Sequence, residues 1–242
     1  MRHPSGVKIL FNEYGHKYYV EGENKRLISV TQILKKYFPV FEKEKIAKLY
    51  AKKHGLKWQE VVAGWTKLGE DSSARGKKYH HVSEKIIKGF LAKTYRRGQN
   101  SDDIAKMIEH KLLSFYKEFH FYPPEYIVAC LYSRIAGAID LVFGNEDTLY
   151  IMDWKFVKEI KIENPWRNCH FPIDHIPDCN FYKFALQLNL YSYIIRKNKY
   201  FPQYPKHELG IFHVKEDEIE DIRIPNMQSE VRNILIHWEK TK

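Results

Sequence analysis

Two aspartates and a lysine occupy two neighbouring apolar segments, and their types and spacing could do chemistry. Asp140 lies within the first segment, 137–143, and Asp153 and Lys155 lie in the second, 149–156, with the polar stretch 145–148 between them. Two apolar runs joined by a short polar stretch predict a β-hairpin. A tight turn centred on that stretch would place Asp140 opposite Asp153, with Cβ atoms roughly 4.5–5.5 Å apart. Lys155 would point to the same face, because side chains alternate along a strand.

The chemistry that such a pair predicts is the binding of a divalent cation. Two carboxylates at that separation repel each other, and a cation between them removes the repulsion. With a lysine beside it, a metal site of this kind is typical of phosphate chemistry. The alternative is a cross-strand ion pair of Lys155 with one aspartate, which leaves the second carboxylate without a partner. The other acid-x-lysine triplets of the chain lie in polar or helical contexts and predict solvated surface: Glu23–Lys25, Glu109–Lys111 and Glu159–Lys161.

Two further pairs have the spacing of one helical turn. His80 and Glu84 would line one helix face, where an imidazole and a carboxylate can both approach a cation. Taken alone, this pair is better explained by a half-buried histidine and an ion pair of Glu84 with a lysine four residues on. Gln187 and Tyr191 could hold a phosphate or orient a base, although an ordinary amphipathic helix explains them better when they are taken alone.

The elements that must position these groups predict a mixed α/β fold with a helical N-terminal part. The N-terminal part would contain a hairpin over 7–20, a helix beginning at Ser29 or Thr31 and ended by Pro39, two short helices over 42–68 broken near His54–Gly55, and a longer helix capped by Ser72 or Ser73 and reaching about residue 92. The remainder would contain a basic loop at 96–101, a helix over 102–120, three strands of a central sheet at 125–133, 135–143 and 148–157, an irregular stretch at 160–179, a helix over 181–197, strands at 208–214 and 219–224, and a helix over 227–239.

The length and composition of the chain limit the classes of protein to which it can belong. With 242 residues the chain can bury a full core, most simply as one domain. No apolar run reaches the roughly 18 residues that a membrane crossing requires, and the N-terminus lacks a secretory signal, so we expect a cytoplasmic protein without a membrane partner. Three cysteines do not make a disulfide framework. The net charge of +10 and a pI near 9.2 favour a polyanionic partner, nucleic acid first, without proving one.

A rival metal site lies in the irregular stretch. Cys169, His170, His175 and Cys179 could supply four zinc ligands. Their spacing is irregular, and the surrounding prolines and aromatic residues suit a loop that faces a substrate. Zinc is therefore the less favoured interpretation.

Taken together, the motifs resemble a known family. The order G-x3-H-x3-E at 76–84, G-x-I-D at 137–140, I-x-D-x-K at 151–155 and Q-x3-Y at 187–191 resembles the RecB-like branch of the PD-(D/E)XK nuclease superfamily. The resemblance spans about residues 65–195, and it looks nearest to phage and viral single-domain exonucleases and the mitochondrial genome maintenance exonuclease. It implies a restriction-endonuclease-like mixed β-sheet core flanked by helices, in a single nuclease domain over 1–242. That domain would divide into an N-terminal hairpin and helical lobe (1–70), a nuclease core (71–225) and a C-terminal helix (226–242).

The resemblance also implies roles for individual residues. Mg²⁺ or Mn²⁺ would be held by His80, Asp140, Asp153 and the backbone carbonyl of Trp154. Lys155 would be the catalytic lysine, and the site or the DNA would be supported by Glu84, Gln187 and Tyr191. The chain departs from the pattern at Lys77, where a small residue is common, and at Ile139, which replaces the proline of the superfamily's name. Three cysteines, none of them N-terminal, argue against an iron–sulfur cluster.

The function that follows is a divalent-metal-dependent DNA nuclease of DNA repair, recombination or replication, encoded by a cell, a phage or a virus. We expect an exonuclease that prefers single strands or DNA ends and leaves a 5′-phosphate. Candidate phosphate contacts are Lys77, Lys78, Lys85, Arg96, Arg97 and Arg134. Two alternatives stay open: a structure-selective or nicking endonuclease, and a non-catalytic nucleic-acid-binding accessory protein.

Overall fold

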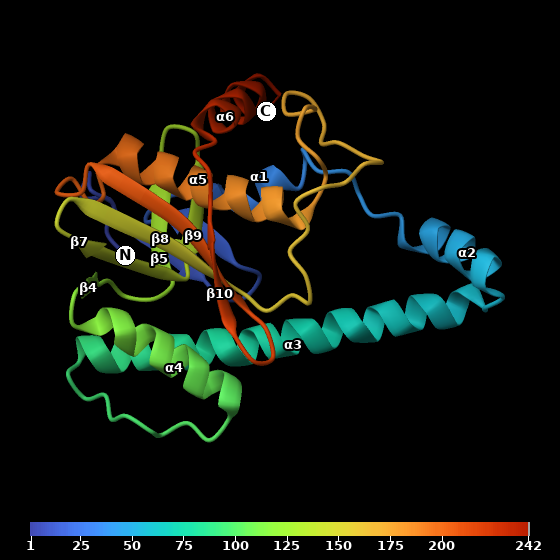
Figure 1. The fold of residues 1–242 in the computed structure, drawn as a ribbon. Helices are drawn as coiled ribbons and strands as arrows, with labels where there is room; N and C mark the ends of the chain where they lie inside the picture. Colours follow the sequence, from blue (N-terminus) through green and yellow to red (C-terminus); the bar gives the residue numbers. More distant parts are fainter. Residues whose placement is uncertain (242) are drawn as a thin grey trace.

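Two five-stranded mixed sheets and six helices make up the described part of the chain, residues 1–241 of this computed structural model (Figure 1). The first sheet has the order β1 (Ile9–Asn12), β2 (Lys17–Val20), β3 (Arg26–Ser29), β6 (Ile135–Ile139) and β5 (Tyr126–Cys130). The second has the order β10 (Ile219–Arg223), β9 (Lys206–Val214), β8 (Thr148–Lys155), β7 (Leu141–Asn145) and β4 (His120–Phe121). The mixed α/β class is confirmed, but the strands form two sheets where the sequence indicated one.

The chain passes from the first sheet to the second at Asp140. Strand β6 ends at Ile139 and β7 begins at Leu141, so the single strand expected over 135–143 is wrong at this point. Apart from their partly exposed positions 138 and 145, both strands are buried, and the apolar pattern therefore runs on without a sign of the break. The break arises because β6 pairs with β3 and β5, whereas β7 pairs with β8 and β4.

The β7–β8 hairpin has the register that the sequence predicts. Asn145 lies opposite Thr148 and Leu141 lies opposite Met152. One further step along this register brings Asp140 beside Asp153. On its other side β8 pairs in parallel with β9.

The first helix begins as expected. Helix α1 (Val30–Leu34) is capped by Ser29, whose Oγ accepts a hydrogen bond of 3.1 Å from the Gln32 backbone N–H, while the Gln32 side chain accepts one from the Ser29 N–H. This capping box satisfies two backbone donors at the helix start. The helix ends at Leu34, before the expected stop at Pro39.

The predicted break near His54–Gly55 is confirmed, but the third helix differs from the prediction. Helix α2 (Lys43–His54) ends at Gly55, which has the left-handed φ of 67°. Helix α3 (Trp58–Leu91) then runs for 34 residues without interruption, so the expected stop near 68 and the cap at Ser72 or Ser73 are wrong. A serine caps a helix only where the preceding chain is not helical. Here both neighbouring segments are helical, and the serines lie exposed in mid-helix.

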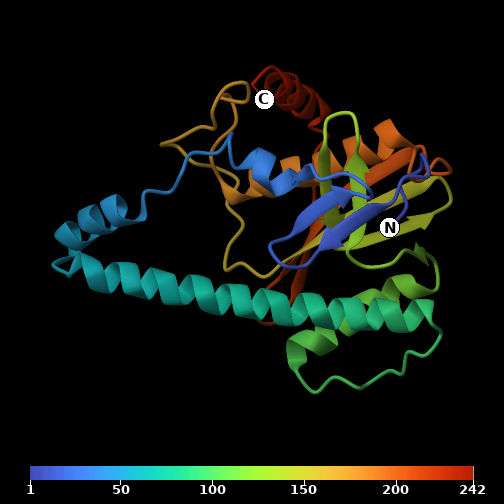
Figure 2. The same cartoon turned by 180° about the vertical axis from the view of Figure 1, so that it is seen from behind.

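Helix α2 and the N-terminal part of α3 project from the body as an arm, defined here as residues 42–78 (Figures 1 and 2). The arm has a small apolar cluster of its own, in which Trp58, Val62 and Trp65 pack against Ala47, Ala51 and Val61. The C-terminal half of α3 packs with α4 (Asp103–Tyr116) against the second sheet. Asp102 caps α4 through the Ala105 N–H. One helix therefore connects the arm to the sheet that carries Asp153.

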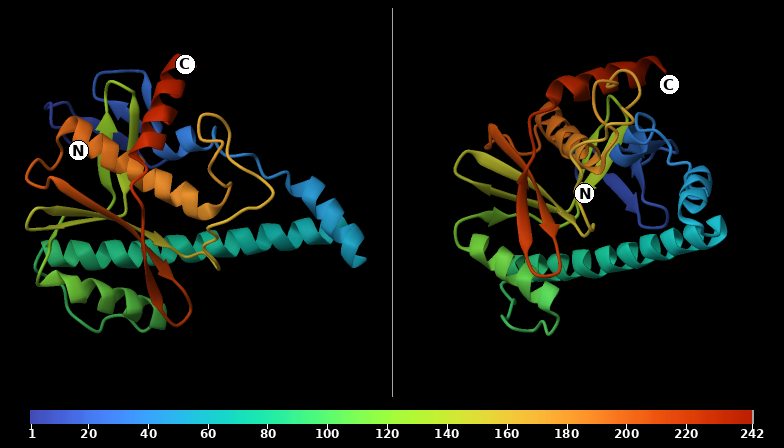
Figure 3. Two further views of the ribbon diagram at one scale, coloured as in Figure 1. Left: turned by 45° about the horizontal axis from the view of Figure 1, so that its top comes forward. Right: turned by 45° about the vertical axis from the view of Figure 1, so that its right-hand side comes forward.

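Helix α5 (Asn180–Asn198) lies on the opposite face of β8, where it contacts strands of both sheets, and α6 (Gln228–Lys240) packs on it (Figure 3). The intervening stretch 160–179 is irregular, as expected, apart from one bridge between Asn168 and Pro177. The pair Asp140–Asp153 thus lies between α3 on one side and α5 on the other. Within residues 1–241 no helix combines the length and the apolar character needed to cross a bilayer.

Candidate metal centre

Asp140 lies where three elements meet. Its Oδ2 atom is 3.3 Å from Nδ1 of His80 on α3 and accepts a hydrogen bond of 3.1 Å from the backbone N–H of Trp154 on β8. The Asp140 side chain is only 14% exposed, because it fills the gap between the two sheets. Helix α3 and the β7–β8 hairpin therefore place His80 and the Trp154 N–H at the carboxylate of Asp140.

Glu125 joins this point, although the sequence analysis missed it. Glu125, His80 and Asp140 each offer one ligand atom, and the three atoms lie within 4.8 Å of one another. Glu125 directly precedes β5 and has a left-handed φ of 51°. The register of the structure places it there: since β5 and β6 pair with Tyr126 opposite Ile139, one further step sets Glu125 beside Asp140.

The carboxyl groups of Asp140 and Asp153 lie close enough to interact electrostatically. Burial, and then the charge of Asp153, raise the pKa of Asp140 well above its usual value. Asp153 is 3% exposed, and its other contact is the ammonium group of Lys155. A buried acid pair of this kind is stable with a shared proton or with a divalent cation between its oxygens.

Lys155 retains its positive charge at this site. Burial alone would lower the pKa of Lys155, but the charges of Asp153 and Asp140 outweigh burial and raise it. The ammonium nitrogen also lies 4.6 Å from the centroid of the Phe184 ring. The ion pair of Lys155 thus forms with Asp153 on its own strand rather than across the hairpin, and Asp140 keeps His80 and the Trp154 N–H as partners.

His80 is held in the neutral form that binds metals. Burial is the main cause that lowers the pKa of His80, and the charge of Lys155 lowers it further. A neutral imidazole is the ligand form of histidine. Of the groups that the sequence proposes as ligands, His80 and Asp140 lie in the grouping with Glu125, whereas Asp153 interacts with Asp140 but lies outside it. The Trp154 backbone contacts Asp140 through its N–H, and not through the carbonyl that the sequence analysis names.

Tyr191 closes the site from the α5 side. It is 3% exposed, and its hydroxyl accepts a hydrogen bond of 3.2 Å from Nε2 of Gln187. Burial is the main cause that raises the pKa of Tyr191, and the charges of Asp140 and Asp153 add to it. The ring lies over Gly137, where a Cβ atom would be 2.5 Å from Cε1 of Tyr191. The glycine of the G-x-I-D motif is thus explained by the approach of this ring.

Glu84 forms the ion pair with a lysine four residues on that was expected when the His80–Glu84 pair is taken alone. Its carboxylate forms an ion pair of 2.8 Å with Lys88, four residues on. It still lies near the centre, since its charge, after burial, raises the pKa of Glu125. Glu84 therefore adds negative charge near the site without joining the group of ligand atoms.

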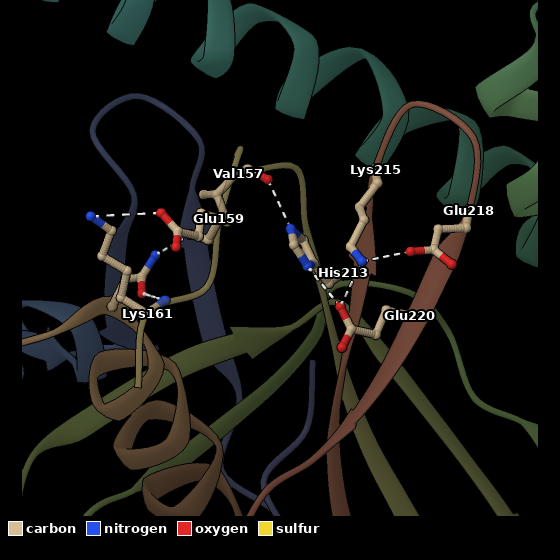
Figure 4. A network of polar contacts seen from close by, with 8 residues as sticks. Val157, Glu159, Lys161, His213, Lys215, Glu218 and Glu220 are labelled. Carbon is tan, nitrogen blue, oxygen red and sulfur yellow. Dashed lines mark hydrogen bonds and ion pairs between the residues drawn. The ribbon is translucent and has the colours of Figure 1, made fainter. Parts of the chain in front are cut away.

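The polypeptide beyond Lys155 is anchored by a buried histidine (Figure 4). His213, which lies opposite Lys155 in the parallel register, places Nε2 2.9 Å from the carbonyl oxygen of Val157 and Nδ1 3.4 Å from Oε2 of Glu220. Glu220 in turn pairs with Lys215 at 3.1 Å. The network fixes the end of β8 against β9 and β10, which holds the strand that carries the lysine.

The candidate phosphate contacts fall into two groups. Lys78 pairs with Asp102 at 2.6 Å, and Arg134 pairs with Glu23 at 2.7 Å, so these two side chains hold the structure together. The others are exposed side chains on α3 or the loop that follows it: Lys77, Lys85, Arg96 and Arg97. The second group is the one positioned to meet a polyanion.

The rival zinc site is not supported. Across residues 1–241 the one grouping of three or more metal-binding side chains is His80, Glu125 and Asp140. Cys169 and Cys179 are buried free thiols. Burial raises the pKa of Cys169 to about 12, which favours the thiol over the thiolate that binds zinc.

No model of a known protein family matches the chain, and no curated protein matches it. The function is therefore argued from the geometry of the site.

Proposed function

We propose that this chain is a divalent-metal-dependent deoxyribonuclease of the RecB-like PD-(D/E)XK type, with a restriction-endonuclease-like core. The observation that carries the proposal is the convergence on Asp140 of an imidazole, two further carboxylates and a charged lysine. Oxygen ligands with one imidazole suit Mg²⁺ and Mn²⁺. The donor set therefore fits the cation that the proposed reaction requires.

The residues that would hold the cation are His80, Glu125, Asp140 and Asp153, with the Trp154 carbonyl. A divalent cation bound there supplies Lewis acidity, which lowers the pKa of water and neutralises charge on phosphoryl oxygens. Because the pKa of Asp140 is raised, the cation competes with a proton for this carboxylate.

Lys155 would act as a fixed cation in the proposed reaction. Since its pKa is raised, the ammonium group stays protonated and can stabilise negative charge that develops on the phosphate. A general base would need a lowered pKa. The charge state of Lys155 therefore favours electrostatic stabilisation over proton abstraction.

The charge distribution favours a nucleic-acid substrate. The arm contains ten Lys and Arg residues against five Asp and Glu residues, a formal net charge of +5 out of +10 for the whole chain. One of the ten, Lys78, is already paired with Asp102 outside the arm. A basic surface of this kind attracts phosphate backbones without reading their sequence. From the family resemblance we propose an exonuclease that acts on single strands or DNA ends.

The test is cleavage of end-labelled single-stranded DNA with Mg²⁺, with Mn²⁺ and with EDTA. Asp140→Asn and Lys155→Ala should each lose about a hundredfold or more in rate while binding DNA normally, because each removes charge that the transition state needs. Glu159→Gln and Lys161→Ala are matched controls, since they belong to an acid-x-lysine triplet that is about two-thirds exposed. Full activity in the Asp140 variant would contradict the proposal.

The same assay separates the alternatives. An exonuclease degrades a linear strand and leaves a closed single-stranded circle intact, whereas an endonuclease cuts both. DNA binding with no metal-dependent cleavage of either substrate would instead identify a non-catalytic accessory protein.

A further inference from the structure

A groove lies beside the C-terminal half of α3, outside the metal centre. It is formed between that helix and the loop over residues 93–101, which runs from the end of α3 to α4 (Figures 1 and 2). We call it the α3 groove. Its volume is about 550 Å³. This lies within the roughly 300–1,000 Å³ of small-molecule sites, so a ligand larger than a simple ion fits.

The floor of the α3 groove is apolar and fixed. It includes Val82 and Ile86 from the helix and the ring of Tyr95 from the loop. The Tyr95 hydroxyl donates a hydrogen bond to the buried carboxylate of Glu109, which holds the ring in place. At Gly89 a Cβ atom would lie 3.1 Å from Cβ of Tyr95, so the loop packs closely on the helix. The floor therefore offers a preformed aromatic and aliphatic surface.

The rim of the α3 groove is cationic. Lys85, Lys88 and Arg96 line it, with the neutral polar side chains of Gln99 and Asn100, and no acidic residue does. Lys85 and Arg96 form no ion pair with any residue between 1 and 241, whereas Lys88 pairs with Glu84. Two uncompensated cations beside an apolar floor favour a ligand that is anionic at one end and flat and apolar at the other.

We propose that the α3 groove binds a nucleoside phosphate, with the base on the floor and the phosphate between Lys85 and Arg96. A base presents a π-face to the Tyr95 ring, and stacking of this kind tolerates any base. Phosphate accepts charge-assisted hydrogen bonds from lysine and arginine. A free anion would leave the floor unused, and an apolar molecule would leave the two cations unpaired.

The groove adjoins the candidate metal centre through Lys88. Lys88 lines the groove, and its partner Glu84 lies one helical turn from His80. A nucleotide in the groove is therefore either free or part of a strand that extends from the centre along α3. The proposal does not depend on the nuclease function, because binding requires neither the cation nor cleavage.

The test measures binding to the full chain in EDTA by calorimetry, with deoxyadenosine monophosphate, inorganic phosphate and deoxyadenosine as probes. The monophosphate should bind about tenfold or more tightly than either other probe, and the double variant Lys85→Ala/Arg96→Ala should weaken it at least about tenfold, because two charged contacts are lost. Lys197→Ala is the matched control, since it removes an exposed, unpaired lysine from α5. Equal affinity for phosphate and monophosphate, or an unchanged affinity in the double variant, would overturn the proposal.

A second arm identifies the source of the nucleotide. Fluorescence anisotropy in EDTA measures the binding of a short labelled single-stranded oligonucleotide to the same proteins. A weaker affinity for both oligonucleotide and monophosphate in the double variant indicates a nucleotide within a strand, and a loss confined to the monophosphate indicates a free one. Because neither measurement contains metal, a failure of the cleavage assay leaves this result standing, and the reverse also holds.

Discussion

Gly137→Ala should disturb the candidate site from beneath. The added methyl group would lie 2.5 Å from Cε1 of Tyr191 and 3.2 Å from its hydroxyl oxygen. The ring cannot move aside easily, because it is 3% exposed and its hydroxyl is held by Gln187. The strain is therefore expected to pass to β6 and to Asp140, three residues further along the chain.

The expected cost follows from two opposing terms. Overpacking a core position costs about 1–3 kcal/mol. Replacing a strand glycine by alanine regains about 0.5–1 kcal/mol of chain entropy. Since a contact of 2.5 Å is far inside van der Waals separation, the steric term wins. We expect a net loss of about 1–2 kcal/mol in the free energy of unfolding.

Urea denaturation followed by circular dichroism measures this free energy. Gly64→Ala on α3 is the matched control, because a Cβ atom there meets nothing within 4 Å, and it should stabilise the protein by about 0.5–1 kcal/mol. In a Tyr191→Ala background the methyl group has room, so only the entropic gain of Gly137→Ala should remain. The two changes should therefore be coupled by the steric term of about 1–3 kcal/mol. Strictly additive effects would refute the steric explanation of this glycine.

Three further predictions concern stability. Burial lowers the pKa of His207 to about 4, so below about pH 6.5 the unfolded chain binds a proton at this histidine before the folded chain does. The free energy of unfolding should therefore fall by about 1–2 kcal/mol from pH 6.5 to 4, after allowance for solvent screening. Urea titrations of His207→Gln should show a smaller fall over this pH range. Leu112→Ala, at a fully buried position of α4, should cost about 2–5 kcal/mol in the same titration. Mn²⁺ at a hundred times its Kd should stabilise the protein by about 2.7 kcal/mol, and a thermal shift that persists in Asp140→Asn would place the cation elsewhere.

The parts of the fold that were predicted correctly depend on local rules. The register of the β7–β8 hairpin follows from the length of its turn and the period of two, so Asp140 and Asp153 could be placed together from the sequence. The cap at Ser29 follows from a serine with glutamine three residues later. In both cases residues close in sequence decide the geometry.

The parts that were missed depend on residues distant in sequence. The change of sheets at Asp140 is imposed by β3 and β4, which no pattern near residue 140 reveals. Ser72 and Ser73 resemble a cap, but only the fold shows that the chain stays helical on both sides. Glu125 joins the grouping with Asp140 because α3 places His80 beside it. Hydrophobic periodicity within one segment does not reveal which residues of distant segments come into contact.

The chain passes from the first sheet to the second at a single residue, Asp140. This residue therefore connects the two sheets directly. Glu125 belongs with the first sheet, whereas Asp153 and His80 belong with the second, so twisting of one sheet against the other alters the distances among these groups. Inserting one residue beside Asp140, between β6 and β7, would shift the two sheets apart and separate the ligand groups of the candidate site. Inserting one residue in the turn at 145–148 would leave the connection between the sheets unchanged. Rigidity between the two sheets is thus the property on which the affinity of the centre for a cation should depend.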